Sequence, residues 1–282
     1  AYAKDRLQGR ALAGPKAPEK PADPIIVHAD VRRSLLTIKA FNEAARALAL
    51  SAALSSDIAH RSPDDKARQA ADDYLGLMTP VIKGVLTDKG FENAVSAQQV
   101  FGGHGYIEEW GMSQFVRDAR ITQIYEGANG IQAMDLVGRK LGKDNGRAVM
   151  AFFSEVGAFC KDNAADEALK PYVTPLQQAL GHLQQATMWF MQNAMAKPDN
   201  AGAGATDYMH LFGLVALGYM WARIAKAAQA RKAEGNGVAE RMDAKLATGR
   251  FFMERMLPET GARLARISAG ADAVMVLPAE MF

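Results

Sequence analysis

The chain has 282 residues, of which 49% are hydrophobic, 23% charged and 8% aromatic, which is typical of a soluble globular protein and not of a disordered or fibrous one. Its 33 Lys and Arg residues nearly balance 31 Asp and Glu residues, so net charge indicates neither nucleic acid nor an anionic membrane as a partner. A single cysteine, Cys160, excludes an internal disulfide framework and fits a reducing compartment, so we expect a cytoplasmic protein.

The N-terminal region is predicted to contain a short helical piece, a proline-rich stretch and a long helix. Residues 1–13 favour helix and do not begin with methionine, so we expect the chain to be an excerpt from a longer protein. Four prolines within residues 14–24 exclude a continuous helix and indicate an ordered loop or a short linker. Asp30 is a suitable N-cap for an amphipathic helix that should continue to about His60.

Further helices are predicted in the rest of the first half, where apolar residues recur with the helical period. They cover about Ala67 to the "DKG" turn at 88–90, about Phe91 to "GGHG" at 102–105, residues 109–122 and residues 129–142. Glycine-rich segments interrupt helices, so "GGHG" and the "YEG" at 125–127 mark connections between helices. The turn-rich "GKDNG" at 142–146 ends this half.

The second half, residues 146–282, is predicted to be an additional helical bundle that follows a first domain of residues 1–145. Helices are expected at about 147–163, 171–196, 205–232 and 236–257, with a loop at 197–207. The uncharged apolar run at 208–222 is shorter than the roughly 20 residues of a membrane span, so we expect a buried helix and no membrane span. "PIIVH" and "AVMVLP" are isolated strand candidates, and the predicted fold class is all-α.

The histidines give no support for a metal site, because they form no HxxxH pair and have no cysteine nearby. They are His28, His60, His104, His182 and His210. Cys160 lies in an apolar helical pattern and is predicted to be buried. We therefore predict no metal.

One longer stretch is more specific than any of its parts. Residues 97–141, "AQQVFGGHGYIEEWGMSQFVRDARITQIYEGANGIQAMDLVGRKL", have a glutamine three residues before a glycine pair, then RDA, then IYEG. "FGGHGY" fits neither GxGxxG after a strand nor GxxxxGK[ST], which excludes those phosphate-binding loops. The order and spacing of the motifs resemble the C-terminal catalytic region of the acyl-CoA dehydrogenases, flavoproteins that desaturate acyl-CoA thioesters between Cα and Cβ. The likeness covers about residues 1–145.

The remainder, which ends "GARLARISAGADAVMVLPAEMF", is similar to the extra C-terminal helical domain of a long bacterial branch of this family, which includes the 3-methylmercaptopropionyl-CoA dehydrogenases. The resemblance implies FAD as cofactor, an acyl-CoA substrate, a homodimer, and an electron-transferring flavoprotein as electron acceptor. Nothing in the sequence indicates nucleic acid as a partner. An N-terminal helical domain and a middle β-domain would precede this chain in the full protein.

Glu126 stands at the position of the family's catalytic base, within an otherwise uncharged stretch. Desaturation removes a weakly acidic proton α to a thioester, so a base must be held at Cα in a site closed to water. Tyr125 and Gly127 would lie against the substrate, and the glycine would allow the sharp turn that aims the carboxylate. Some relatives place the base on another helix and have a small residue here, whereas this chain keeps the glutamate.

The resemblance also implies contacts to FAD, which in this family lies across a subunit interface. Gln99, Gly102 and Gly103 match the segment that meets the adenosine and pyrophosphate of the cofactor from the neighbouring subunit. Arg6 falls where a relative has an arginine on the pyrophosphate, although the residues after it differ in length from the common pattern. A solvated helix arginine is the alternative interpretation of Arg6.

One position departs from the family pattern, and two others have a structural interpretation. Most relatives read EGT with a threonine hydroxyl near FAD, whereas this chain has Ala128, so the backbone or Asn129 would have to substitute for that hydrogen bond. Arg117 and Asp118, on a predicted helix, are interpreted as structural residues that act through pairing or capping.

Alternative functions stay open at this point. A stand-alone helical interaction module would keep the family's shape without its catalysis, although retention of Glu126 together with Gln99 and the glycine pair favours the enzyme. An acyl-CoA oxidase that uses oxygen is a near variant. The motifs do not specify the length or polarity of the acyl group.

Overall fold

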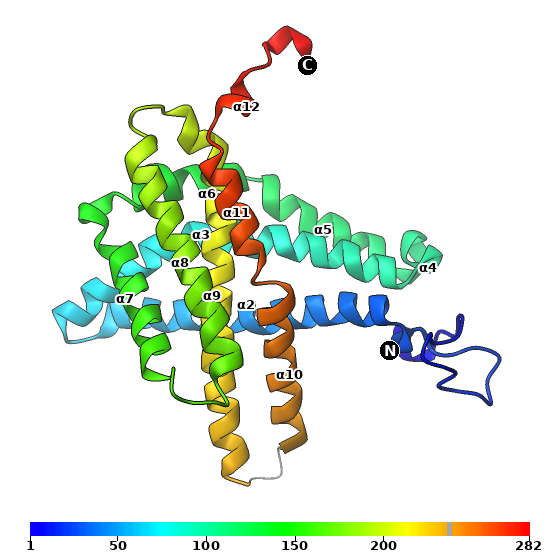
Figure 1. The fold of residues 1–282 in the computed structure, drawn as a ribbon. Helices are drawn as coiled ribbons and strands as arrows, with labels where there is room; N and C mark the ends of the chain where they lie inside the picture. Colours follow the sequence, from blue (N-terminus) through cyan, green and yellow to red (C-terminus); the bar gives the residue numbers. More distant parts are fainter. Residues whose placement is uncertain (236–238) are drawn as a thin grey trace.

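The computed structural model describes residues 1–235 and 239–282, and these residues form helices without a β-strand (Figure 1). In the first half the α-helices are α1 (Tyr2–Asp5), α2 (Ala29–Arg61), α3 (Asp65–Val100), α4 (Gly103–Tyr106), α5 (Met112–Ile124) and α6 (Asn129–Asp135). In the second half they are α7 (Arg147–Asp162), α8 (Lys170–Asn193), α9 (Asp199–Ala233), α10 (Ala239–Arg255), α11 (Glu259–Ser268) and α12 (Asp272–Met275). Short 3-10 turns lie at Ile25–Val27, Glu108–Trp110, Lys143–Gly146 and Ala279–Met281, and a π-turn lies at Leu136–Lys140. The predicted all-α fold is confirmed.

The long helices of the first half form a frame that the second half crosses. Helices α2 and α3 lie antiparallel and side by side, and α5 lies along the outer part of α3 (Figure 1). Helices α7 to α11 form a bundle in which α9 crosses α2 and α3 near their middle (Figure 1). The crossing is close because Gly213 of α9 faces α3, where an added Cβ would lie 2.7 Å from the side chain of Val85.

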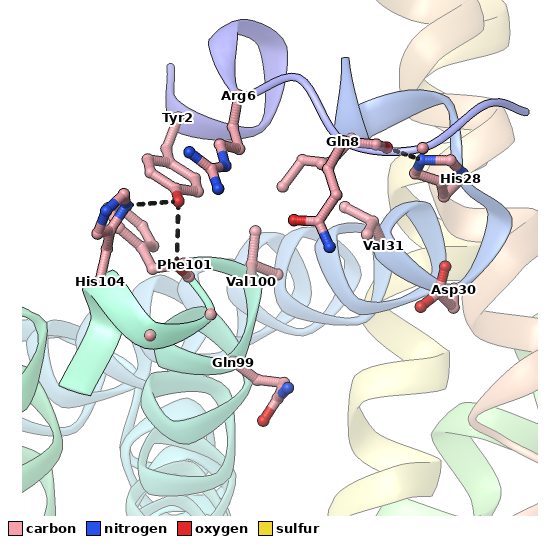
Figure 2. Close-up of a pocket in the computed structure, with 14 residues that line it drawn as sticks. Tyr2, Arg6, Gln8, His28, Asp30, Val31, Gln99, Val100, Phe101 and His104 are labelled. Atoms are coloured by element: carbon pink, nitrogen blue, oxygen red, sulfur yellow. Dashed lines mark hydrogen bonds between the residues drawn. The ribbon is translucent and has the colours of Figure 1, made fainter. Parts of the chain in front are cut away.

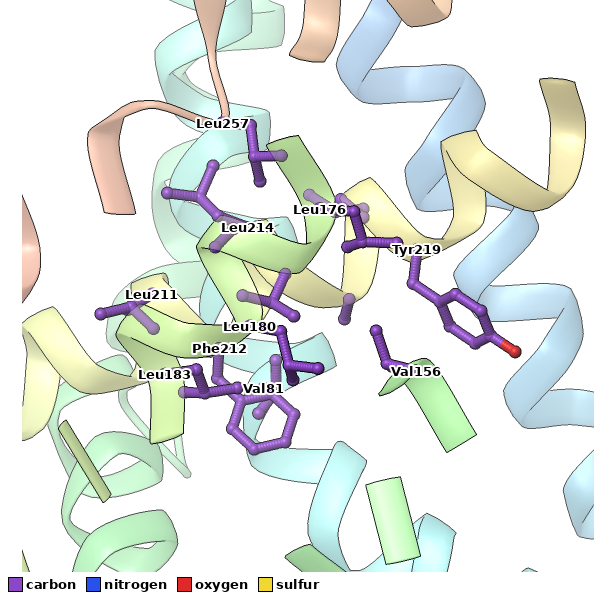
Figure 3. Packing of buried hydrophobic residues seen from close by; sticks show 14 of the residues in the cluster. Val81, Val156, Leu176, Leu180, Leu183, Leu211, Phe212, Leu214, Tyr219 and Leu257 are labelled. Atoms are coloured by element: carbon purple, nitrogen blue, oxygen red, sulfur yellow. The ribbon is translucent and has the colours of Figure 1, made fainter. Parts of the chain in front are cut away.

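Both halves contribute to one hydrophobic core. Figure 3 shows side chains from α3, α7, α8 and α9 in this cluster, among them Val81, Val156, Leu183 and Phe212. The indole of Trp221 in α9 donates a hydrogen bond of 3.0 Å to the carbonyl of Ala40 in α2. The sequence boundary near residue 145 therefore separates two segments whose buried side chains pack together.

Helix α9 is long and apolar enough, by length and composition, to cross a membrane. However, 78% of its apolar 18-residue segment is buried inside the protein. Residues 208–222 are all buried, which confirms the predicted buried helix. Cys160 in α7 is also buried, as predicted, and this burial raises the pKa of its thiol to about 11. The apolar character of α9 is therefore accounted for by its central position in the bundle.

The break predicted at 88–90 was wrong, because α3 continues without interruption to Val100. A glycine inside a helix costs only about 1 kcal/mol relative to alanine. Packing of α3 against α2 on one side and α5 on another outweighs that cost at Gly90. The predicted stop at "GGHG" is confirmed, since α3 ends directly before Phe101.

Other predicted boundaries were wrong. The loop expected at 197–207 is largely helical, because α9 begins at Asp199 and its Gly204 packs so closely on Phe190 that a Cβ would lie 2.8 Å away. Asp30 is not the N-cap of α2; His28 takes that position, and Asp30 lies in the first turn. "PIIVH" and "AVMVLP" form a 3-10 turn and part of α12 instead of strands. The first residues of the helix expected at 236–257 lie outside the described residues, which resume at Ala239.

Candidate functional site

The loop after α1 is organised around the buried carboxylate of Asp23. Three backbone amides donate to it, those of Ala11, Lys16 and Ala17, at 2.9, 2.9 and 2.7 Å. The Arg10 guanidinium donates as well, at 3.3 Å. The hydrogen bond from Ala11, joined by the other donors, holds the pKa of the Asp23 carboxyl at about 2 in spite of its burial. Residues 14–24 are therefore an ordered loop and not a flexible linker.

This loop fixes the position of Arg6. The amide of Gln8 donates to the carbonyl of Asp23 at 2.9 Å, and the amide of Ile25 donates to the carbonyl of Arg6 at 2.8 Å. These bonds align the chain on either side of the loop, so Arg6 follows α1 in an extended conformation instead of continuing the helix. Its backbone is held even though its side chain is exposed.

Arg6, Gln99, Gly102 and Gly103 line a single cavity of about 580 Å³ between the N-terminal loop and the end of α3 (Figure 2). The structure thus brings together the four residues that the family resemblance assigns to the pyrophosphate side of FAD, but not Asn129. Two segments far apart in the sequence supply them. This convergence was not imposed by the local sequence of either segment.

Aromatic side chains join the two walls of this cavity. The hydroxyl of Tyr2 donates to the carbonyl of Phe101 at 3.1 Å and lies 2.9 Å from Nδ1 of His104 (Figure 2). The Tyr2 ring stacks on Phe101 with centroids 4.3 Å apart, and His104 stacks on Trp110 at 4.5 Å. Tyr2 and His104 are cavity residues that the sequence did not single out: Tyr2 lies outside the quoted motifs, and His104 lies within "GGHG" but was considered only as a possible metal ligand.

The glycine pair leaves the main chain bare where it borders the cavity. Gly102 has φ +58 and ψ −139, a conformation that residues with a Cβ rarely adopt. A Cβ added at Gly102 or Gly103 would meet nothing within 4 Å, so the space in front of both is open. The Gly102 amide already donates to the carbonyl of Gln99 at 3.0 Å. The Arg6 guanidinium borders the same cavity, and a guanidinium beside main chain without a blocking side chain fits an anionic group such as a pyrophosphate.

Glu126 lies on a short connection between α5 and α6. Helix α5 ends at Ile124, Tyr125 is extended, and Gly127 has φ +77, which provides the sharp turn expected from the sequence. The side-chain amide of Gln132 donates to the carbonyl of Gly127 at 3.2 Å. The carboxylate of Glu126 is exposed, and it forms no hydrogen bond or ion pair with any residue that the structure describes. It is free to meet a group supplied from outside this chain.

A polar network lies directly behind this loop, centred on Asp88 of α3. One carboxylate oxygen, Oδ1, accepts hydrogen bonds of 2.6 Å from both Gln123 and Asn129. The other oxygen, Oδ2, lies 2.8 Å from Nε2 of His210 in α9. Burial acts to raise the pKa of Asp88, but the hydrogen bonds from His210, Gln123 and Asn129 outweigh it and hold that pKa at about 2.

Asn129 uses its side chain inside this network and not at the cavity. It is buried, accepts from Lys83 Nζ at 2.6 Å, and donates to the carbonyl of Gly84 and the hydroxyl of Thr87 as well as to Asp88. Lys83 also lies 5.4 Å from the centroid of the half-exposed Tyr125 ring. The structure therefore separates Asn129 from the other predicted cofactor contacts.

Arg117 and Asp118 are exposed on α5, and neither pairs with another residue in the described part of the chain, so the predicted pairing is not seen. Within the same part of the chain, no group of three or more His, Cys, Asp or Glu residues is arranged to hold a metal ion.

The cavity and Glu126 lie at opposite ends of α5 (Figure 1). This helix has 13 residues, and at 1.5 Å per residue its axis is about 20 Å long. Glu126 is not among the residues that line the cavity. One copy of this chain thus presents the two candidate elements at separate places, the carboxylate near the bundle and the glycine pair at the outer end of α3.

Two family models together match most of the chain. The model described as "Acyl-CoA dehydrogenase, C-terminal domain" matches residues 9–141, and the model described as "Acetyl-CoA dehydrogenase C-terminal like" matches residues 152–278. The chain belongs to the acyl-CoA dehydrogenase family. Residues 142–151 lie between the two matches, and they include the turn-rich segment at 142–146 that ends the first half of the sequence.

The relatives of this family member include a protein of the branch that the sequence resembles, the 3-methylmercaptopropionyl-CoA dehydrogenases. The chain is 37% identical to the 3-methylmercaptopropionyl-CoA dehydrogenase of Ruegeria pomeroyi, over 97% of this chain and 46% of that protein. It is 32% identical to the broad-specificity linear acyl-CoA dehydrogenase of Mycobacterium tuberculosis, over 91% of this chain and 44% of that protein. The chain thus spans a little less than half the length of these relatives.

The fold of this acyl-CoA dehydrogenase family member is also similar to solved structures. ACDH-11 of Caenorhabditis elegans, solved in complex with C11-CoA, superposes with a TM-score of 0.71 over 97% of this chain and 42% of that one, at 18% identity. Acyl-CoA oxidase 3 of Yarrowia lipolytica superposes with a TM-score of 0.64 over 95% of this chain and 40% of that one, at 19% identity. These likenesses concern the fold alone.

Proposed function

We propose that this chain is the C-terminal catalytic part of an FAD-dependent acyl-CoA dehydrogenase that desaturates an acyl-CoA thioester between Cα and Cβ. The observation that carries the proposal is the convergence of Arg6 with Gln99, Gly102 and Gly103 on one open cavity. The family resemblance implies an FAD contact for each of these four residues from the sequence alone. A helical module without catalysis would not require a cation and a bare glycine pair to meet there.

Glu126 is the proposed base for the α-proton. The Gly127 turn presents its carboxylate at the surface of the chain, where no described side chain of this chain competes for it. A bound acyl-CoA and its covering would remove water from the carboxylate, which raises its basicity and favours proton abstraction from Cα. Tyr125, half-exposed beside Glu126, is proposed to lie against the substrate together with Gly127.

Arg6, Gln99, Gly102 and Gly103 are the proposed cofactor contacts on this chain. The guanidinium of Arg6 would pair with pyrophosphate oxygens, and the glycine pair would let the main chain approach them closely. When bound, FAD supplies the acceptor for the hydride that leaves Cβ. Asn129 was expected to substitute for a threonine hydroxyl at FAD, but its buried side chain favours the backbone near Ala128 for that role.

Assembly as a homodimer is part of the proposal, because the base and the cavity lie at opposite ends of α5. Large apolar side chains are exposed on that helix, including Phe115 at 63%, Ile121 at 52% and Ile124 at 53%. Such a surface is characteristic of an interface between proteins. We further propose an electron-transferring flavoprotein as electron acceptor, a cytoplasmic location, and domains at 1–145 and 146–282.

The proposal is tested with the full-length protein under anaerobic conditions. Butyryl-, octanoyl- and palmitoyl-CoA are added in turn, and bleaching of the flavin absorbance is recorded with and without an artificial electron acceptor. Bleaching that turns over with the acceptor supports a dehydrogenase. After air is admitted to the reduced protein, rapid reoxidation by oxygen with release of hydrogen peroxide would assign the oxidase variant. A full-length preparation that binds no flavin and is inert to all three thioesters would refute the enzyme.

A further inference from the structure

The loop that carries Glu126 is held at both ends by one carboxylate. Gln123, in the last turn of α5, and Asn129, the first residue of α6, both donate to Oδ1 of Asp88 at 2.6 Å. Residues 124–128 lie between these two anchors. Since Glu126 itself forms no hydrogen bond or ion pair with a described residue, its position follows from where the two ends of its loop are fixed.

Asp88 is in turn fixed by the second half of the chain. Its other oxygen, Oδ2, lies 2.8 Å from Nε2 of His210, and because a carboxylate only accepts, the ring nitrogen is the donor. His210 is 5% exposed and lies on α9 where that helix crosses α3. The close approach at Gly213, one turn further along α9, sets the spacing that lets this side chain reach Asp88.

The side chains around Asp88 are held in place by further hydrogen bonds and by different helices. Asn129 also accepts from Lys83 at 2.6 Å and donates to Thr87 at 2.8 Å, so its amide orientation is fixed from several directions. The three side chains that donate to Asp88 come from three different helices, α5, α6 and α9. A carboxylate with donors on both oxygens has little freedom to rotate, so movement at one donor is transmitted to the others.

We infer that Asp88 is a positioning residue for the Glu126 loop and that His210 couples this loop to the C-terminal bundle. The inference rests on the proposed role of Glu126 for its catalytic consequence, but not for its structural content. The second half of the chain then contributes directly to the site, because α9 holds the carboxylate that sets where the base stands. Misplacement of a reacting group by about 1 Å can lower a rate by roughly a hundredfold.

Four variants of the full-length protein test the inference. Asp88→Ala removes the acceptor, and His210→Phe removes the donor while keeping a ring in the core. His210→Gln restores a donor amide and is the conservative rescue. Tyr208→Phe is the matched control, because it deletes another buried hydrogen bond of the same helix, the 2.7 Å bond to Thr187, without touching Asp88.

The first readout is amide hydrogen exchange over residues 119–132, which needs neither substrate nor flavin turnover. We expect exchange at least roughly tenfold faster in Asp88→Ala and His210→Phe than in Tyr208→Phe, with His210→Gln closer to wild type. Equal exchange in Asp88→Ala and the Tyr208→Phe control would overturn the inference. This holds whether or not the protein proves to be a dehydrogenase.

The second readout is the rate of anaerobic flavin reduction at saturating acyl-CoA, with butyryl-, octanoyl- and palmitoyl-CoA as probes. We expect Asp88→Ala and His210→Phe to reduce flavin roughly ten- to a hundredfold more slowly, with FAD content and acyl-CoA affinity retained. Wild-type rates in both variants, with Glu126→Gln inactive, would overturn positioning and leave the proposed function intact. A fully active Glu126→Gln variant would refute the proposed base, and the exchange data alone would then decide the structural role of Asp88.

Discussion

The hydroxyl of Tyr2 lies 2.9 Å from Nδ1 of His104, so the first turn of the chain is tied to the glycine segment that follows α3. The same hydroxyl donates to the carbonyl of Phe101 at 3.1 Å. These contacts make one wall of the cavity depend on the other. The side chain of Tyr2, which belongs to no recognised motif, therefore fixes the segment of Arg6 relative to the glycine pair.

Tyr2→Phe should weaken FAD binding without unfolding the protein. The ring still stacks on Phe101, but both hydrogen bonds are lost, and one such bond contributes about 1 kcal/mol. We expect the Kd for FAD to rise about fivefold, measured by flavin fluorescence during titration of the full-length apoprotein. Tyr106→Phe is the control, because Tyr106 is 82% exposed on the neighbouring turn. Equal effects of the two variants would argue against this role for Tyr2.

Glu126→Gln should leave FAD bound and suppress its reduction by acyl-CoA. The amide keeps the shape of the side chain but cannot accept a proton from Cα, so we expect a rate at least roughly a hundredfold lower in stopped-flow absorbance measurements. Glu109→Gln serves as the control, since Glu109 is an exposed glutamate outside the loop. Near-normal bleaching in Glu126→Gln would remove this residue from the role of base.

Gly103→Val should reduce FAD retention much more than helical content. An added Cβ meets nothing within 4 Å in this chain, so the substitution causes no internal clash and its side chain occupies the cavity instead. Flavin content after gel filtration and circular dichroism report the two effects separately. Gly138→Val is matched to it, because a Cβ at Gly138 also meets nothing and that position lies away from the cavity. Loss of FAD from both variants alike would indicate a general effect on the fold.

Mixed dimers should show whether the cavity acts on the flavin of the partner subunit. The heterodimer has one subunit with Glu126→Gln and one with Gly103→Val. If each flavin meets the base of one subunit and the glycine segment of the other, both defects fall at one flavin. The other flavin then keeps an intact base and an intact glycine segment. Activity should then recover to about half of wild type per dimer, measured on heterodimers purified with two tags. A cavity that acts within its own subunit predicts no recovery.

Asp88→Asn should destabilise the protein at neutral pH and progressively less in acid. The pKa of Asp88 is lowered from 3.8 to about 2 in the folded protein, so its ionised form stabilises the fold above the unfolded value. That contribution is lost as the pH falls from about 4 toward 2. We expect the free energy of unfolding of Asp88→Asn to be about 1–2 kcal/mol lower than that of wild type at pH 7, allowing for partial exposure of the carboxylate.

This difference is measured by denaturant unfolding of wild type and Asp88→Asn. The measurement is made at three pH values: neutral pH, a pH near the pKa of Asp88 in the unfolded chain, and a pH close to its pKa in the folded protein. The gap between the two proteins should narrow at the lowest pH, because the unfolded wild-type chain then binds a proton at Asp88 that the folded protein does not yet bind. A gap that stays constant across this range would mean that the charge of Asp88 does not stabilise the fold.

Local sequence determined several features of this protein without any knowledge of contacts. Glycine content located the connection after α3 and the Gly127 turn, since glycine lowers helix stability and permits positive φ wherever it stands. Apolar periodicity located most helices and the buried run in α9. The motifs in residues 97–141 identified the family, because their order and spacing depend on the chain alone.

Tertiary structure decided what the side chains do. Helix α3 continues through Gly90 because its packing on α2 and α5 outweighs a local cost, and no window of sequence contains those neighbours. Arg6 meets the glycine pair, and His210 meets Asp88, only because distant segments cross in space. Asn129 was interpreted as a cofactor contact from its place after the "YEG" turn, yet the donors and acceptors around it in α3 bury its side chain. Which polar groups surround a residue is set by the packing of helices far apart in the chain, and that packing is a property of the whole fold.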